Sequence, residues 1–445
     1  MSQSRQEIFR EKYHAGLELI SEGKHEEAMA LLYEAAKIAP EGWLALANEL
    51  IKDGKPELAE DRCKEILKLT KDFRILAAAY NNLGMIYCAK GLLTASEEAF
   101  NESRNLVSTS PDPLSNLALI HQWRQCYPES IRYASRALAI DPWHEQAQFI
   151  RSMCLLLSGD YIEGFKEYEC RWRSKNNGLS KLNCNMPEWN GRNGKSVFIY
   201  GEQGHGDSIL MMRYAKQIKA MGLKQSWVTQ KSMSDLIRTI PEIDCVVEVG
   251  DPLPDFDCHL PAVSLPRVLG TTTSNIETKP YVPKPEDAVD YGEGFHVGIS
   301  WRGSPSQTND PIRSSSLKQW SDLLNVPGVT FHSLQAENAE EVLLYPEIKT
   351  YPAPSGWLET ARRMAGLDLV ISVDTAIVHL AGSMGIQCLC ALHSRPYFVY
   401  PPKFGDITPW YDSVKLFRAR KEHDWDFVFN NITNELIKRT SRRSA

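Results

Sequence analysis

Residues 1–173 carry an internal repeat, and this repeat limits the possible folds more than any other feature of the chain. Counted from Gly16, spacings of 12, 16, 19 and 24 residues lead to Ala28, Leu32, Ala35 and Pro40. The same positions recur further on as Ala118, Ser130, Ala134, Ala137 and Pro142. A copy that starts at Gly84 keeps the first four positions, and looser copies start at Ala47 and Ser152. Successive copies are therefore separated by 31, 37, 34 and 34 residues. Small residues at these spacings let the two helices of a hairpin approach closely, and the proline ends the second helix.

This pattern resembles the tetratricopeptide repeat, a helical hairpin of about 34 residues. The resemblance covers about five units and predicts a repeat domain over residues 1–173. A generic helical bundle is the alternative. Such arrays stack into a superhelix whose concave face binds a peptide or another partner, or they buttress a neighbouring domain. The pattern is compatible with both uses.

The rest of the chain alternates short apolar runs with amphipathic segments. After a polar linker at residues 174–194, this alternation fills residues 195–285 and then starts again over residues 286–445. Strands separated by helices indicate parallel sheets with right-handed crossovers. We therefore expect an α-helical domain followed by an α/β region of two Rossmann-like domains that face a cleft.

A glycine-rich turn connects the first strand and helix of this region. The apolar run 196–199 reads as a strand, residues 200–208 as the turn, and residues 209–220 as a helix. A strand, a glycine-rich turn and a helix together present backbone N–H groups to a negatively charged ligand. Asp207 lies where the turn becomes the helix, and its carboxylate either caps that helix or acts as a base.

Net charge, cysteine spacing and the distribution of apolar residues limit the kinds of function and location that we expect for this chain. The formal net charge of -6 gives no support to a general nucleic-acid binder. The ten cysteines form no C-x-x-C pair, which favours buried free thiols in a reducing compartment. The start of the chain has no apolar signal core and no run of eighteen apolar residues occurs, so we expect a cytoplasmic protein without membrane insertion.

Four motifs occur in a fixed order along the α/β region. They are Gly201-Glu202-Gln203-Gly204-x-Gly206-Asp207, Val297-Gly298-Ile299-Ser300-Trp301, Asn309-Asp310-x-x-Arg313-Ser314, and Ser372-Val373-Asp374-Thr375-x-x-x-His379-Leu380-Ala381-Gly382. Together they resemble the bacterial lipopolysaccharide heptosyltransferases, a glycosyltransferase family with the GT-B fold. The layout, with repeats before the catalytic half, is also similar to that of protein O-linked N-acetylglucosamine transferases.

The heptosyltransferase resemblance implies a glycosyltransferase. Such an enzyme moves a sugar, a hexose, heptose or pentose, from a nucleoside-diphosphate sugar to an acceptor hydroxyl. It implies inversion at the anomeric carbon, no metal and no cofactor apart from the nucleotide sugar as co-substrate. Residues 195–285 would be the acceptor side and residues 286–445 the nucleotide-sugar side.

The resemblance assigns the base to Asp207, and His205 in the same turn is the alternative. A histidine with an ordinary pKa near 6.5 can act as a base or donate a hydrogen bond to phosphate, and a loop histidine can also have no role. Gly204 and Gly206 shape the turn and are expected on the donor side.

The expected donor site has two further parts. Asp374, Thr375 and His379 follow a buried strand and open a helix whose N–H groups and Thr375 hydroxyl can cradle a diphosphate. His379 either reaches the same group or packs under the turn. Arg302 and Arg313 lie in a loop after another strand, where arginines suit bidentate phosphate recognition. The alternative for both is a solvated loop charge.

Two other site types are disfavoured by the sequence. Asp255-Phe256-Asp257 has the D-x-D form of a metal motif, but such a tripeptide arises easily by chance, and we expect no metal site. No G-x-G-x-x-G turn follows a predicted strand, which argues against a nucleotide-dependent oxidoreductase.

The repeats favour a macromolecular acceptor, either a protein or a hydroxyl-bearing polymer, with modified DNA as a further possibility. The alternative function is a non-catalytic tetratricopeptide scaffold whose degenerate GT-B half binds a nucleotide. Joint retention of Asp207, Arg313, Asp374 and His379 argues against such decay.

Overall fold

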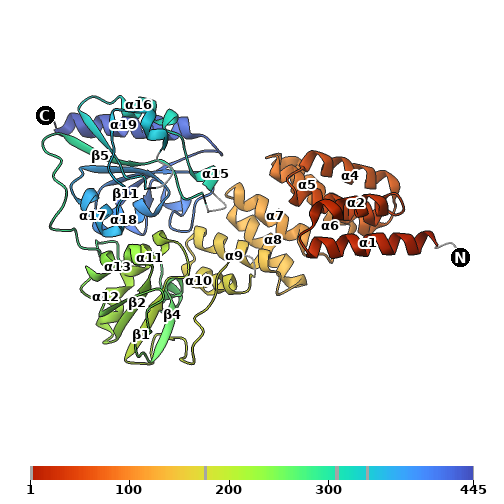
Figure 1. The fold of residues 1–445 in the computed structure, drawn as a ribbon, viewed down its shortest axis with the longest axis horizontal. Coiled ribbons are helices and arrows are strands. Elements are labelled where there is room, and N and C mark those ends of the chain that lie inside the picture. The colour runs from red at the N-terminus through yellow and green to blue at the C-terminus, as the bar shows by residue number, and fades with distance from the viewer. Residues whose placement is uncertain (1–3, 175–177, 306–309, 337–339, 444–445) are drawn as a thin grey trace. The chain divides into compact units, whose positions relative to one another are not determined.

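The structure is a computed structural model that describes residues 4–174, 178–305, 310–336 and 340–443. The chain separates into two compact units, residues 1–154 and residues 155–445 (Figure 1). The first unit is helical, and the second carries two β-sheets.

The first unit is built of antiparallel helix pairs joined by short turns (Figure 1). Its helices are α1 (Arg5–Ser21), α2 (His25–Ala36), α3 (Pro40–Lys52), α4 (Pro56–Leu69), α5 (Phe73–Ala89), α6 (Leu93–Leu106), α7 (Asp112–Trp123), α8 (Tyr127–Ile140) and the first part of α9 (Glu145–Ser158). Prolines lie in the first turn of α3 and α4, where the missing N–H does no harm. Consecutive pairs α1–α2, α3–α4, α5–α6 and α7–α8 correspond to the repeats expected from the sequence.

The repeated small residues lie where two helices of a pair touch. A β-carbon on Gly16 would come within 2.9 Å of the Leu32 side chain, and one on Gly84 within 2.4 Å of the Phe100 ring. The hydroxyl of Ser96 donates to the carbonyl of Gly84 at 2.6 Å, and Ser130 donates in the same way to Ala118 at 2.7 Å. The close approach predicted from the spacing is therefore present, and the unit is a tetratricopeptide-like array.

Side-chain amides connect the first helices of successive pairs. Asn82 of α5 donates to Asn48 of α3 at 2.6 Å, and Asn116 of α7 donates to Asn81 of α5 at 3.0 Å. Gln146 of α9 donates to Asn116 at 3.3 Å. Asn48 and Gln146 are exposed, so this amide row reaches solvent.

Helix α10 (Tyr161–Tyr168), the last of the predicted array, belongs to the second unit. Tyr161 and Phe165 are buried and pack on Trp410, and Phe165 also contacts Phe398 edge to face. The Trp410 indole donates to the Tyr161 hydroxyl at 2.9 Å. The boundary between the compact units therefore lies after residue 154, upstream of the boundary expected after residue 173.

The first sheet has four parallel strands in the order β3-β2-β1-β4. Its strands are β1 (Ser196–Tyr200), β2 (Lys224–Thr229), β3 (Cys245–Glu248) and β4 (Cys258–Pro261). Helix α11 (His205–Met211) follows β1 and continues through a 3-10 turn into α12 (Ala215–Ala220), and α13 (Lys231–Arg238) follows β2. Strands and helices lie where the alternating pattern predicts them.

The second sheet has seven strands in the order β10-β11-β9-β8-β5-β6-β7, parallel except for β10 against β11. Its strands are β5 (Phe295–Ser300), β6 (Val329–Ser333), β7 (Ile348–Lys349), β8 (Leu369–Val373), β9 (Cys388–Leu392), β10 (Ile407–Thr408) and β11 (Tyr411–Arg418). The helices of this region are α15 (Asp310–Arg313), α16 (Ser321–Leu324), α17 (Trp357–Ala365), α18 (Ala376–Met384) and α19 (Trp425–Arg443). In Figure 1, α16 and α19 lie on one side of this sheet and α17 and α18 on the other.

Several elements here differ from the expectations. Strands β7, β10 and β11 were not predicted, because β7 and β10 are two residues long and β11 mixes buried residues with exposed polar ones. Residues Glu340–Leu344 form a 3-10 segment, and residues 337–339 lie outside the described part. The chain thus combines a helical tetratricopeptide-like array with an α/β unit of parallel sheets.

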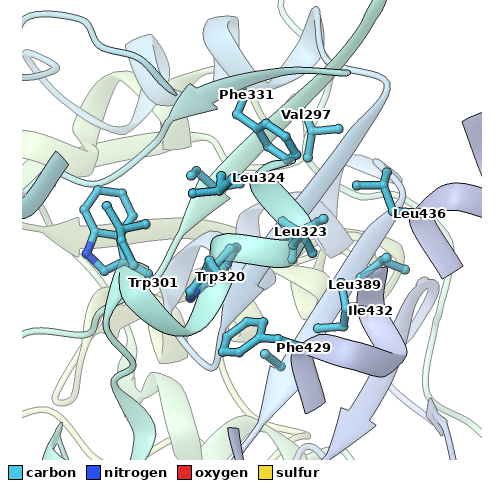
Figure 2. Packing of buried hydrophobic residues seen from close by; sticks show 14 of the residues in the cluster. Val297, Trp301, Trp320, Leu323, Leu324, Phe331, Leu389, Phe429, Ile432 and Leu436 are labelled. Carbon is cyan, nitrogen blue, oxygen red and sulfur yellow. The ribbon is translucent and has the colours of Figure 1, made fainter. Parts of the chain in front are cut away.

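A hydrophobic core of the second unit lies between the seven-stranded sheet and the helices α16 and α19. Figure 2 shows Trp320 packed against Phe429, with Leu323 and Ile432 beside them. The ring centroids of Trp320 and Phe429 lie 4.6 Å apart. This core fixes β5 and its neighbours, whose carboxyl ends carry the candidate site.

Candidate functional site at the carboxyl ends of two sheets

Each sheet has one position where the order of its strands reverses. The chain runs from β1 outward to β2 and β3 and then returns to β4 on the other side of β1. It likewise runs from β5 outward to β6 and β7 and returns to β8. In open parallel sheets, ligands bind beyond the carboxyl ends of the strands at such reversal points. The turns after β1 and β8 contain Asp207 and Asp374, so both predicted acids lie at these positions.

Asp207 caps the helix that follows the turn. It is the third residue of α11, and its carboxylate accepts the backbone N–H of Gly204 at 3.2 Å. An acid at this position stabilises a helix start by satisfying a free N–H and by facing the positive end of the helix dipole. The capping role considered for Asp207 is present, and one carboxylate oxygen can serve it while the other faces the site.

The surroundings of Asp207 also change its acidity. Desolvation, followed by the negative charge of Glu202, raises the pKa of Asp207 to about 7. Asp374 adds to this rise, while hydrogen bonding by Tyr397 and Gly204 opposes it. A carboxylate whose pKa lies near neutral pH suits general-base chemistry, because it is both ionised and basic enough to take a proton.

The turn after β8 presents Asp374 beside cationic and neutral donors. Desolvation raises the pKa of Asp374, and the positive charge of Arg313 opposes that rise. His393 lies 3.9 Å from Asp374, and burial with two nearby arginines lowers the pKa of His393 to about 4. The Thr375 hydroxyl caps α18 by accepting from the N–H of Ile377 at 3.3 Å. Asp374 and Thr375 thus lie in the turn after β8, and the charge of Arg313 acts on Asp374.

Arg313 ends the short helix α15, and its guanidinium lies over Gly303. A β-carbon on Gly303 would fall 2.4 Å from Nη2 of Arg313, so a larger residue there would displace the guanidinium. Arg313 also lies 3.5 Å from the carboxylate of Asp310. Asn309, which precedes this pair in the motif, lies outside the described residues.

The helices that follow β1 and β8, α11 and α18, touch each other through Gly206 and His379. A β-carbon on Gly206 would lie 2.8 Å from Cδ2 of His379 and 3.4 Å from Cα of Ala376. His379 is buried, and its Nδ1 lies 2.9 Å from the hydroxyl of Tyr411. Desolvation and the nearby Arg213 lower the pKa of His379 to about 3, so its ring is neutral. His379 is thus packed between Gly206 of α11 and Tyr411.

Arg213 is a buried cation that joins three segments of this region. It donates to the carbonyl groups of Leu210, Glu277 and Trp410 at 2.9, 2.8 and 2.9 Å. Its guanidinium also stacks 4.9 Å from the Tyr281 ring centroid. The segment that leads from the first sheet to the second is therefore held against α11.

The remaining predicted residues lie at the edge of this cluster. Nε2 of His205 lies 2.8 Å from the Gln230 side-chain oxygen, and the ring of His205 packs edge-on to Trp357. Gly204 has room for a β-carbon, whose only near neighbour would be Asp207 at 3.5 Å. The side chain of Arg302 is exposed, and its backbone bonds to Gln335. The D-x-D residue Asp257 accepts the N–H groups of Lys195 and Ser196 and so secures the start of β1.

Sequence reasoning missed the loop after β9, residues 393–401. This loop brings His393 to Asp374 and Tyr397 to Asp207. The hydroxyl of Tyr397 also donates to Gln203 at 3.2 Å and lies 3.5 Å from the hydroxyl of Tyr168. The loop has no periodic pattern and no motif, so its only sequence signal is its position after a buried strand.

A buried ion pair behind Asp207 was also missed. Arg171, just after α10, donates to Glu202 at 3.0 Å, and their side chains are 2% and 1% exposed. Arg171 also donates to Glu169 at 2.9 Å and to the Ser264 hydroxyl at 2.8 Å. Because the positive charge of Arg171 offsets the charge of Glu202, Glu202 opposes the ionisation of Asp207 less strongly.

Among the described residues, no helix has both the length and the apolar character needed to cross a bilayer.

The chain was compared with known proteins. No protein-family model matches it. It is 23% identical over 422 residues to Protein FlbA of Caulobacter vibrioides, covering 85% of this chain and 70% of FlbA. Among solved structures, the tetratricopeptide protein TTC0263 of Thermus thermophilus is 17% identical, with 38% of this chain and 93% of TTC0263 covered and a TM-score of 0.32. PilF of Pseudomonas aeruginosa is 17% identical, with 49% and 88% covered and a TM-score of 0.37.

Proposed function

We propose that the α/β unit is a GT-B glycosyltransferase that moves a sugar from a nucleoside-diphosphate sugar to an acceptor hydroxyl. The observation that carries the proposal is the meeting of two strand-turn-helix units, one with Asp207 and one with Asp374, at the reversal points of two parallel sheets. A general base and a phosphate-binding turn would then share one site.

In the proposed reaction, Asp207 removes the proton of the acceptor hydroxyl. The freed oxygen forms a bond to the anomeric carbon on the side opposite the leaving group. The bond between that carbon and the diphosphate oxygen breaks, and its electron pair leaves with the nucleoside diphosphate. The anomeric configuration inverts because one displacement occurs, and the pKa of Asp207 near 7 supports its role as base.

The leaving diphosphate needs positive charge and N–H donors. Helix α18 is nine residues long and begins directly after β8, so its first N–H groups can face a diphosphate there. Arg313, 19% exposed and beside Asp374, would supply positive charge, with exposed Arg302 further out. Asp374 would then bond sugar or ribose hydroxyls rather than phosphate, since like charges repel.

We further propose that the repeat unit binds a macromolecular acceptor. The amide row of Asn48, Asn81, Asn82, Asn116 and Gln146 supports this, because amide side chains can donate to and accept from a peptide backbone. Amides carry no charge, so such a surface suits a protein or hydroxyl-bearing polymer better than DNA.

The test is a thermal-stability panel of UDP, GDP, ADP and CDP and their common sugar conjugates, followed by measurement of nucleoside diphosphate release. A selective rise of several degrees would identify the nucleoside, because a ligand that binds only the folded state stabilises it. Asp207→Asn should keep this rise and lose turnover, whereas Asp235→Asn, an exposed acid on α13, should keep both. Turnover that survives in Asp207→Asn would move the base to His205. Absence of any nucleotide effect would overturn the proposal in favour of a scaffold.

A further inference from the structure

We propose that Tyr397 is a positioning residue for the Asp207 carboxylate, and that Gln203 and Tyr168 hold Tyr397 in place. The inference deepens the proposed function and rests on it for the role of Asp207 as base. Tyr397 comes from the loop after β9, Gln203 from the turn before α11, and Tyr168 from the last turn of α10. The site would therefore depend on a helix that the sequence pattern assigns to the repeats.

The three polar side chains form a chain that ends at Asp207. Nε2 of Gln203 donates to the hydroxyl of Tyr168 at 3.1 Å. The hydroxyl oxygens of Tyr168 and Tyr397 lie 3.5 Å apart, and hydrogen bonding by Tyr397 lowers the pKa of the Asp207 carboxylate. A proton on Tyr168 can then point to Tyr397, and the proton of Tyr397 to Asp207.

The hydroxyl of Tyr397 has one proton and two acceptors. The first is the Gln203 carbonyl oxygen at 3.2 Å, and the second is the Asp207 carboxylate. An ionised carboxylate is the stronger acceptor, so the proton turns to Asp207 when that acid loses its own. When Asp207 is protonated, Gln203 is the better acceptor. The arrangement therefore favours the ionised carboxylate and fixes its direction.

Packing keeps this chain in place. Tyr168 is buried, and its ring contacts Phe398 edge to face. The ring of Tyr397 lies 4.2 Å, centroid to centroid, from that of Phe398. Tyr397 itself is half-buried.

Several other groups also raise or lower the pKa of Asp207. Glu202 in the same turn and Asp374 in the turn after β8 are acids that oppose its ionisation. Arg171 is paired with Glu202, and Arg313 acts on Asp374. The N–H of Gly204 and the hydroxyl of Tyr397 favour the charged form of Asp207. Removing one of these two donors should keep the acid protonated to higher pH.

The experiment is an infrared titration of buried carboxyl groups in the full chain. Asp207→Asn identifies the Asp207 signal as the one that it removes. Tyr397→Phe, which deletes only the hydroxyl, should move the midpoint of that signal upward by about one pH unit, a tenfold change in the ionisation constant. Tyr168→Phe should move it in the same direction by less. Tyr291→Phe is the control, since its hydroxyl bonds to the Arg363 carbonyl, and it should leave the midpoint unchanged.

An unchanged midpoint in a folded Tyr397→Phe chain would overturn the inference, whether or not the chain transfers sugars. If a nucleotide sugar is turned over, Tyr397→Phe should also lower kcat at pH 7 about fivefold, because a pKa near 8 in place of 7 leaves about one eleventh rather than one half of Asp207 ionised, with partial recovery at higher pH and an unchanged thermal shift by the nucleoside diphosphate. A loss of kcat that is the same at every pH would indicate a merely structural role. If no nucleotide sugar is turned over, the proposed function fails while the titration still decides the role of Tyr397.

Discussion

Gly206 lies against the imidazole of His379, and a β-carbon on this glycine would come within 2.8 Å of Cδ2 in that ring. Because Gly206 belongs to α11 and His379 to α18, this contact joins the two helices that open at the candidate site. The requirement for glycine here is steric and does not depend on a ligand.

Substitution of Gly206 by alanine should therefore destabilise the α/β unit. Overpacking a close contact costs about 1–3 kcal/mol, and the better helix propensity of alanine offsets up to about 1 kcal/mol. We expect a net loss of about 1–2 kcal/mol in urea unfolding. The matched control is Gly204→Ala, where the nearest atom, an Asp207 oxygen, lies at an ordinary 3.5 Å, and it should change stability by less than about 0.5 kcal/mol. Equal effects of the two variants would contradict the contact.

Asp207→Asn should stabilise the chain in a pH-dependent manner. The folded-state pKa of Asp207, about 7, lies above its ordinary value of 3.8, so the stability from its protonated form is present below pH 4 and lost as the pH rises to 7. Asparagine has no charge to bury and avoids this loss. The upper limit is about 4 kcal/mol at 1.36 kcal/mol per pKa unit, and solvent access to this half-buried group reduces it to about 1–3 kcal/mol.

The measurement is the melting temperature of both chains between pH 4 and 8. The advantage of Asp207→Asn should be largest at pH 8 and disappear near pH 4. Asp235→Asn should show no such trend, because Asp235 is 70% exposed. If the melting-temperature advantage of Asp207→Asn instead grew toward acidic pH, the raised pKa of Asp207 would be wrong.

Arg171 should contribute to stability mainly because its charge pairs with the buried charge of Glu202. Arg171→Met leaves Glu202 buried without its cation and should cost about 3–5 kcal/mol. The double variant Arg171→Met/Glu202→Gln removes both charges and should recover a large part of that loss. Urea unfolding of the two single variants and the double variant gives the coupling between them. Losses that simply add would show that the two residues do not act as a pair.

Arg213→Met should likewise destabilise the α/β unit by about 3 kcal/mol or more. Three carbonyl groups, on Leu210, Glu277 and Trp410, lose the donor that satisfies them. Lysine should rescue little, because an ammonium group lacks the planar fork of guanidinium. Arg238, which is 48% exposed, provides the control, and Arg238→Met should cost less than about 1 kcal/mol in the same unfolding experiment.

Arg313 and Arg302 should differ in nucleotide binding. Arg313→Gln removes the cation beside Asp374 and should weaken nucleoside diphosphate binding about tenfold or more, as expected for a hydrogen bond to a charged group. Arg302→Gln should have a smaller effect because its side chain is exposed. Calorimetric titration with the nucleoside diphosphate found in the stability panel measures both. A larger loss of binding in Arg302→Gln than in Arg313→Gln would place the diphosphate further out along the loop, near Arg302.

Local patterns predicted the elements that depend on neighbours in sequence. The spacing of small residues predicted the contacts of Gly16 and Gly84 within helix pairs, and apolar runs predicted β1 and β8 with the turns that follow them. The positions of Asp207 and Asp374, each between a strand and a helix, were predicted because the sequence pattern of such a connection is recognisable.

Residues whose role depends on distant contacts were not found. Tyr397 is 190 residues from Asp207, and nothing in its own loop indicates that the two meet. The pairing of Arg171 with Glu202 likewise requires the fold, since burial rather than spacing distinguishes this pair from a surface one. The assignment of α10 to the repeats was reasonable from its small residue Gly164, which does contact Leu156, but its aromatic face packs on Trp410.

Helix α10 continues the repeat pattern in sequence but packs as part of the α/β unit, and this limits how such a chain can be modified. The helix pairs upstream of α9 lie in the first compact unit, whereas Asp207 and the side chains that act on it lie in the second. Any grafted array, however, must retain a last helix with the aromatic residues Tyr161, Phe165 and Tyr168, because the α/β unit uses them as its own. The junction for modular exchange is therefore residue 154 rather than the end of the repeat pattern.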